Sequence, residues 1–263
     1  MTAPTLTLSL VQAATHWHDP EANRSMFSGL LTGLAEDVRV VLLPEMFSTG
    51  FTMHSAQVAE TMDGETVEWM RQESAGLDKV LCGSVVIEEA GAYYNRFLAA
   101  YPDGDVLTYD KRHRFRMAGE HQHYSAGGEK IVFEVDGWRI CPMVCYDLRF
   151  PVWFRNRDEY DVLVCVANWP AARRDAWTTL LRARAIENQA YVAAVNIVGT
   201  DGNGVMYSGG SACYTGDGGV LGEAFDTAQT LTCTLSASGL HDLRQAFPVS
   251  RDADDFELKT EHT

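Results

Sequence analysis

The sequence predicts an α/β fold in which two mixed β-sheets pack on each other, with helices on the outside. Apolar runs typical of buried parallel strands alternate with amphipathic helical stretches, as in strand–helix–strand crossovers. Other strand-like runs are joined by short turns such as EAG and PDGD, which are typical of antiparallel hairpins. A purely parallel sheet would not need so many hairpins, so both kinds of strand pairing are expected.

The first third of the chain predicts strand, helix and strand. Residues 5–12 and 38–44 read as strands, and Asp19 can cap a helix that has Pro20 at its first position. The apolar residues of this helix share one face, which we expect to be buried: Ala22, Met26, Leu30 and Leu34. A second amphipathic helix is expected near 65–76.

The rest of the chain continues the alternation. The expected strands of a hairpin meander are 79–88, 92–101 and 106–111. A hairpin turning at Asp136-Gly137 follows, and then come buried strands at 161–167 and 191–197. The helix between those two strands ends near Gln189 and carries an apolar stripe: Trp177, Leu180, Leu181 and Ala185. The last expected elements are strands within 211–215, 220–225 and 230–236 and a helix to Phe247.

The composition predicts one globular domain over residues 1–263. The chain is 46% hydrophobic and has no linker, repeat or low-complexity tract. The acidic, polar tail after about residue 248 is expected to extend along the surface or toward a partner subunit.

Charge and cysteine usage narrow the function classes. The net charge of -15 argues against nucleic acid and anionic membranes as partners. No apolar stretch approaches the ~20 residues of a membrane helix, and the N-terminus does not resemble a secretory signal. The six cysteines are scattered, mostly in apolar runs, so we expect a reduced, cytoplasmic protein.

Four polar residues each follow an apolar strand at its carboxyl end: Glu45, Lys111, Cys145 and Asn168. Because binding sites of α/β sheets gather at this edge, these side chains are expected to converge. Each also has a plain structural interpretation, as a core thiol, a solvated lysine or a loop acid. Together they suit thiol chemistry, since a carboxylate can accept the thiol proton and an ammonium can stabilise an oxyanion, with the Tyr146 N–H as second donor.

Four stretches, LLPEMFSTGF, YDKRHRFRMAGEHQHYSAG, CPMVCYDLRFP and LRARAIENQAYVAAVN, together resemble the motifs of the nitrilase superfamily of carbon–nitrogen hydrolases. The resemblance covers about residues 5–248. It implies Cys145 as nucleophile, Glu45 as general base, Lys111 as oxyanion-stabilising lysine and Glu120 as a second carboxylate lining the site. It also implies a four-layer αββα sandwich and a homo-oligomer, and we expect no cofactor and no metal.

The stretch MAGEHQHYSAG is most similar to the ω-amidase branch, which hydrolyses terminal amides of short α-keto dicarboxylic acids, such as α-ketoglutaramate, and releases ammonia. The expected partners are therefore a small amide and water. An amidase or nitrilase acting on other small substrates at the same site is the alternative. Nothing resembling a synthetase domain follows in this sequence, so we do not expect a glutamine-dependent ligase.

The substrate's distal carboxylate needs a cation, and the candidates near the motifs are Arg116, Arg149, Arg173 and Arg174. Arg173 is our choice, with Asn168 and Trp169 as further substrate-binding residues. We expect Arg149 to pair instead with Asp147 and so to brace the turn after Cys145.

Three other interpretations have different requirements. A zinc site would use Cys141, Cys145, His121 and His123, but C-x₃-C is not the usual ligand spacing. A papain-like enzyme needs a histidine base and a nucleophile that begins a helix, whereas Cys145 closes a strand. An inactive interaction module would be free to lose any member of the Cys-Glu-Lys set.

Overall fold

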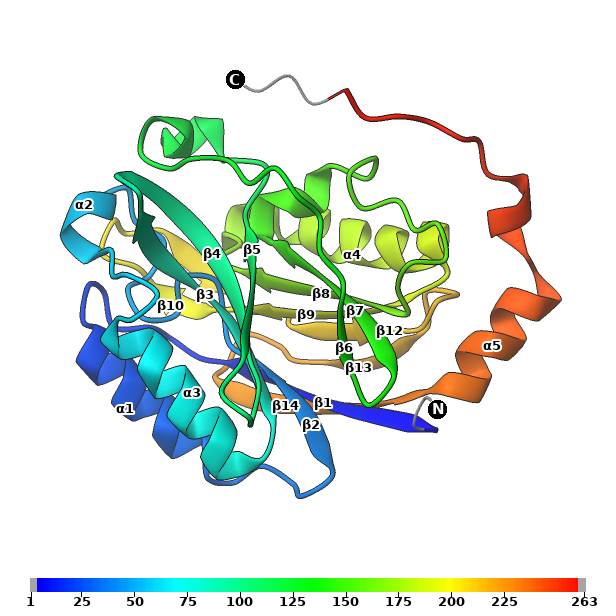
Figure 1. The fold of residues 1–263 in the computed structure, drawn as a ribbon, viewed down its shortest axis with the longest axis horizontal. Helices are drawn as coiled ribbons and strands as arrows, with labels where there is room; N and C mark the ends of the chain where they lie inside the picture. The colour runs from blue at the N-terminus through cyan, green and yellow to red at the C-terminus, as the bar shows by residue number, and fades with distance from the viewer. Residues whose placement is uncertain (1–3, 260–263) are drawn as a thin grey trace.

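The computed structural model describes residues 4–259 and contains two six-stranded sheets (Figure 1). The first sheet has the order β14-β1-β2-β3-β4-β5, and the second has the order β13-β12-β9-β8-β7-β6. The first sheet consists of β1 (Thr5–Gln12), β2 (Val38–Leu42), β3 (Val80–Glu89), β4 (Ala92–Ala100), β5 (Val106–Asp110) and β14 (Gln229–Ser236). The second consists of β6 (Phe133–Val135), β7 (Trp138–Val144), β8 (Val162–Ala167), β9 (Tyr191–Asn196), β12 (Ala212–Tyr214) and β13 (Val220–Glu223).

Both sheets are mixed, as the sequence predicts. Strands β1, β2 and β3 pair in parallel, as do β7, β8 and β9, whereas β3-β4-β5 and β6-β7 are antiparallel. One hairpin was not predicted, β10 (Val198–Thr200) with β11 (Met206–Ser208). Its strands have three residues each, too few to show a periodic pattern.

Helices cover the outer faces of the sheets. Figure 1 shows α1 (Pro20–Leu31) and α3 (Glu65–Leu77) side by side on the first sheet, and α4 (Arg174–Asn188) packs on β9 of the second. The remaining helices are α2 (Ser55–Val58) and α5 (Ala237–Ala246). Among the described residues, no helix combines the length and apolar character needed to cross a membrane.

Strand β2 shows why its sequence is continuously apolar. Val40 and Leu42 belong to the core shared with the second sheet, whereas Val41 and Leu43 pack with Phe27 of α1. Both faces of the strand are covered, so neither face selects polar residues.

The predicted buried face of the first helix is wrong by one residue. The buried residues of α1 are Asn23, Phe27 and Leu31, while Leu30 is exposed. Asn23 is buried because its side chain bonds to the backbone of two loops: Oδ1 accepts from His16 N at 2.7 Å, and Nδ2 donates to His16 O and Ser48 O. The apolar pattern cannot reveal a buried asparagine, and so the predicted face was rotated.

The chain after Pro248 forms a short 3₁₀ helix at Val249–Asp252 and then runs without regular structure, mostly exposed, to residue 259 (Figure 1). Arg157 contacts this tail: its Nη2 donates to Phe256 O at 2.6 Å, and its guanidinium lies 4.3 Å from the Phe256 ring centroid.

Candidate active site

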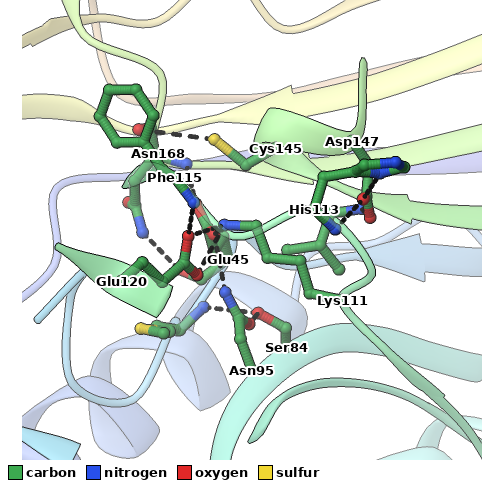
Figure 2. Close-up of polar contacts among 12 residues, drawn as sticks. Glu45, Ser84, Asn95, Lys111, His113, Phe115, Glu120, Cys145, Asp147 and Asn168 are labelled. Atoms are coloured by element: carbon green, nitrogen blue, oxygen red, sulfur yellow. Dashed lines mark hydrogen bonds and ion pairs between the residues drawn. The ribbon is translucent and has the colours of Figure 1, made fainter. Parts of the chain in front are cut away.

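Residues from both sheets meet where their strands end, as Figure 2 shows. Glu45 follows β2 and Lys111 follows β5 in the first sheet, while Cys145 and Asn168 follow β7 and β8 in the second. Lys111 Nζ lies 2.9 Å from Glu45 Oε1, and Asn168 N donates to Glu45 Oε2 at 2.9 Å. The two sheets therefore bring together all four residues that the sequence placed at strand ends.

Lys111 lies between two carboxylates. In addition to Glu45, its Nζ contacts Glu120 Oε1 at 2.8 Å and Oε2 at 3.0 Å, and all three side chains are buried. Burial opposes a charge on Lys111, but Glu120 and Glu45 outweigh it and hold the pKa of this lysine well above its usual value. The site therefore keeps a fixed ammonium group that has no exposure to solvent.

Glu120 belongs to the same buried cluster as Glu45. It occupies a short 3₁₀ turn, Glu120–Gln122, and contacts Lys111, which lines the cavity, whereas neither carboxylate is itself part of the cavity wall. Burial raises the pKa of its carboxyl group, Lys111 lowers it, and the charge of Glu45 raises it, so that the net shift is upward. Its contact with Phe115 N ties it to the loop that follows Lys111.

Glu45 is held by a chain of buried polar groups that the sequence analysis did not identify. Asn95 Nδ2 donates to Glu45 Oε1 at 2.8 Å, and Ser84 Oγ donates to Asn95 Oδ1 at 2.7 Å. On the other side, Asn168 Nδ2 donates to the Glu45 backbone oxygen. The available signal was a polar residue inside each of two apolar strands, β3 and β4, because a buried polar side chain needs a partner.

Cys145 sits at a sharp turn. It follows β7 directly, begins a 3₁₀ helix at Cys145–Arg149 and has φ 46°, a left-handed conformation that a non-glycine residue rarely adopts. A papain-like enzyme needs a nucleophile that begins a helix, and Cys145 does begin a short 3₁₀ helix, but the nearby acceptor for its proton is the Glu45 carboxylate and not a histidine. Burial first, and then the charge of Glu45, raise the pKa of the Cys145 thiol well above its usual value, while Lys111 lowers it. The resting side chain is therefore a neutral thiol.

A cavity of about 510 Å³ opens beside Cys145. Its walls include Lys111, Tyr146 and the predicted substrate residues Asn168, Trp169 and Arg173. Aromatic side chains that the sequence analysis did not identify complete the wall: Phe51, Phe115 and Tyr207. Residues of the β10–β11 hairpin also line it, so the unpredicted hairpin contributes to the site.

Two guanidinium groups line this cavity without ionic partners. Arg149 lies 4.9 Å from the ring centroid of Trp169, and Arg173 lies 5.2 Å from that of Phe115. Within residues 4–259 neither group forms an ion pair or a side-chain hydrogen bond. Arg174, in contrast, is bound to Ser208 O and to Glu223.

The expected pairing of Arg149 with Asp147 is wrong. Both Asp147 oxygens are taken by Tyr109 Oη, His113 N, His113 Nδ1 and Val144 N, at 2.8–3.1 Å. The side chain of Arg149 points to the cavity because Asp147 is already saturated with donors from elsewhere in the chain.

The residues proposed for zinc do not form a cluster. Cys141 lies in the hydrophobic core, and His123 is exposed. In the part of the chain that the structure describes, no group of three or more His, Cys, Asp or Glu side chains is arranged to hold a metal ion.

Comparison with known proteins gives consistent matches along the whole chain. Residues 7–245 match the carbon-nitrogen hydrolase family. The chain is 49% identical over 255 residues to the omega-amidase YafV of Yersinia enterocolitica, covering 97% of this chain and 99% of that protein. It is 45% identical over 256 residues to the Escherichia coli K12 omega-amidase YafV, with 97% and 99% covered. With the 2-oxoglutaramate amidase of Bacillus subtilis it shares 30% identity over 252 residues, 94% and 96% of the two chains.

A solved structure matches equally well. XC1258 from Xanthomonas campestris, described as a CN-hydrolase superfamily protein with an arsenic adduct in the active site, superposes with a TM-score of 0.95. The two chains are 48% identical, and the match covers 97% of this chain and 99% of XC1258.

Proposed function

The chain belongs to the carbon–nitrogen hydrolase family and is a hydrolase of carbon–nitrogen bonds, and from this premise we propose that it is an ω-amidase working through a cysteine acyl-enzyme. Its substrate would be the terminal amide of a short ω-amido acid such as α-ketoglutaramate. The names of the relatives support this substrate class, since they include omega-amidases and a 2-oxoglutaramate amidase.

The observation that carries the proposal is the buried Glu45–Lys111–Glu120 array at the strand ends where Cys145 also lies. Glu45 accepts the Cys145 proton as Sγ attacks the amide carbon, and the carbonyl oxygen becomes an oxyanion. Lys111 Nζ and the Tyr146 N–H stabilise that oxyanion. The proton then passes to the amide nitrogen, the C–N bond breaks, and ammonia leaves behind a thioester on Cys145.

Hydrolysis of the thioester uses the same groups again. Glu45 accepts a proton from a water molecule, whose oxygen attacks the thioester carbon, and the Cys145 sulfur leaves and regains a proton. The products are a free carboxylic acid and the resting thiol. Glu120 keeps Lys111 charged and in place through both steps, because each of its oxygens contacts Nζ.

The two unpaired guanidinium groups support a substrate with a second carboxylate. Arg173 and Arg149 each lie over an aromatic ring in the cavity wall, which leaves their N–H donors available. A carboxylate entering a half-buried cavity loses hydration that a planar guanidinium fork replaces with two hydrogen bonds. We assign the distal carboxylate to Arg173 and, in place of the expected brace on Asp147, also to Arg149. Trp169 and Asn168 line the same cavity as these arginines and Cys145.

An amidase or nitrilase for other small substrates at the same site is the alternative. A nitrile has no leaving amine in its first step, and a substrate without a second carboxylate would not need two free guanidinium groups. The arginines therefore favour the ω-amidase.

The test compares kcat/KM for α-ketoglutaramate, its decarboxylated monoamide analogue and a matching nitrile. Loss of the distal carboxylate should lower kcat/KM at least ~10-fold, about 1.4 kcal/mol of transition-state binding. Arg173→Gln and Arg149→Gln should lower kcat/KM for α-ketoglutaramate but not for the analogue, whereas Arg182→Gln, on the exposed face of α4, should change neither. A neutral amide or a nitrile as the better substrate would contradict the ω-amidase proposal and leave the hydrolase family untouched.

We also propose that the protein acts in the cytoplasm and as a homo-oligomer. All six cysteines are unpaired and buried, which suits a reducing compartment. Three exposed apolar side chains come from neighbouring elements: Ile186 of α4, and Val220 and Leu221 of β13. Ile186 lies against Gly218, in the turn before β13. Covering such a surface with a second copy removes apolar area from water.

A further inference from the structure

Asp147 is a buried carboxylate that the proposed reaction does not use. Its side chain is fully shielded from solvent and accepts four hydrogen bonds, two on each oxygen. Tyr109 Oη at 2.8 Å and Val144 N at 3.1 Å donate to Oδ2, while His113 N at 2.9 Å and His113 Nδ1 at 2.8 Å donate to Oδ1. No arginine or lysine pairs with it among the described residues.

The donors come from the two segments that carry the reacting groups. Tyr109 and His113 lie two residues before and two residues after Lys111, at the end of β5 in the first sheet. Val144 directly precedes Cys145, at the end of β7 in the second sheet. Figure 2 shows Asp147 and His113 on the side of Lys111 away from Glu120. One carboxylate therefore connects the lysine segment of one sheet to the cysteine segment of the other.

A second contact strengthens the same connection. The His113 ring stacks on Phe150, with ring centroids 3.8 Å apart and planes within 4°. Phe150 follows the 3₁₀ helix that Cys145 begins, so His113 contacts that helix at its middle residue, Asp147, and also contacts the residue directly after it.

The catalytic geometry needs such a connection. Lys111 Nζ must lie within hydrogen-bond distance of an oxygen whose position is set by Cys145, yet the two residues belong to different sheets. Cys145 is also held at φ 46°, and a strained residue persists only where its surroundings over-determine it. The Val144 N–H that donates to Asp147 belongs to the residue directly before Cys145.

We propose that Asp147 is a positioning residue that fixes Lys111 relative to Cys145. The inference rests on the proposed Cys-Glu-Lys chemistry but not on the choice of substrate. A positioning role differs from a purely stabilising role because it predicts that a variant of Asp147 is acylated more slowly even when it is fully folded.

The test variant is Asp147→Asn, with Tyr109→Phe as a milder second variant. A carboxamide has one oxygen in place of two, so it leaves two of the four donors unpaired and points its own NH₂ at a donor. We expect kcat to fall about 10- to 100-fold with KM changed little, since misplacement by about 1 Å has effects of this size. Tyr109→Phe removes one of the four hydrogen bonds to Asp147, together with the longer bond that Tyr109 Oη accepts from Arg112 N at 3.3 Å, and should lower kcat about three- to tenfold. Iodoacetamide alkylation of Cys145, followed on its peptide by mass spectrometry, should slow in parallel.

The matched control is Asp161→Asn. Asp161 is also a largely buried carboxylate with several donors, from Arg139 and Arg244, but it precedes β8 at the opposite end of the sheet from the site. This variant should lose stability and keep kcat. Folded Asp147→Asn with kcat within about twofold of wild type, or a loss that merely tracks the unfolded fraction, would overturn the proposal. If no amide of this class is hydrolysed by wild type but Asp147→Asn still slows alkylation, the proposed substrate fails and the positioning role stands.

Discussion

The burial of Cys145 opposes the ionisation that a cysteine nucleophile requires. Its burial keeps the thiol protonated, whereas attack on an amide needs the thiolate. In the proposed mechanism, Glu45 resolves this by accepting the proton during the attack, with Lys111 close by to favour the anion.

The resting state of Cys145 is directly testable. Because burial and the charge of Glu45 raise its pKa, the thiol is neutral at pH 7 and ionises only well above the ordinary thiol range. We expect the ultraviolet difference spectrum between wild type and Cys145→Ala to show no thiolate band at neutral pH. A thiolate band at neutral pH would instead indicate a preformed ion pair, as in papain-like enzymes.

The role of Cys145 as nucleophile predicts both a loss and an adduct. Cys145→Ala should abolish turnover and leave the circular dichroism spectrum and melting temperature close to those of wild type, since the side chain lost is small. Mass spectrometry of wild type shortly after mixing with substrate should show an acyl group on the Cys145 peptide. An adduct found only on another cysteine would exclude the assignment.

Lys111 is expected to act through its position as well as its charge. Its Nζ contacts Glu45 and Glu120, with the Phe51 ring centroid 5.2 Å away, and a longer, planar guanidinium would not place a donor at the same point. Lys111→Arg should therefore lower kcat by about 10²–10³, the effect of losing one oxyanion donor. Turnover by this variant near the wild-type rate would disprove the role.

At the scale of elements, α1 shows how a polar side chain can orient a helix. The predicted face was apolar, but the observed one centres on Asn23, which bonds to the loops at His16 and Ser48. Ser48 lies three residues after Glu45, so α1 also supports the segment that carries the proposed general base.

Asn23→Ala should therefore destabilise the protein more than an ordinary helix substitution. It leaves three backbone groups without their partner, and we expect a loss of about 2–4 kcal/mol in the free energy of unfolding. Urea denaturation measures this directly. Ser25→Ala, two residues away on the exposed face, is the control and should stay within about 0.5 kcal/mol of wild type. Equal midpoints for both variants would show that Asn23 is not needed for packing.

At the scale of the whole molecule, the site lies between the two sheets and needs both. Glu45, Lys111 and Glu120 belong to segments of the first sheet, and Cys145 and Asn168 to the second. The apolar core shared by the sheets fixes the relative position of these groups.

The exposed apolar side chains of β13, Val220 and Leu221, are where we expect copies to meet in the proposed homo-oligomer. If Val220 lies in the contact between copies, Val220→Asp places a charge there and should shift the protein toward monomer in light-scattering measurements. Val132→Asp alters another exposed valine outside this surface and should leave the mass unchanged. An unchanged mass for Val220→Asp would place the contact elsewhere or show that there is none.

The sequence by itself determined the family, the four residues at strand ends and most of the elements, though not the β10–β11 hairpin, because apolar periodicity is a local property of the chain and each of these polar residues closely follows its strand. Only the tertiary structure decided the hydrogen-bond partners. Asn23 pairs with Ser48, and Asp147 pairs with Tyr109 and His113 in place of Arg149. A buried polar group takes whichever hydrogen-bond partners folding brings near it, and these partners lie 25 to 38 residues away in the chain, beyond the reach of any local pattern.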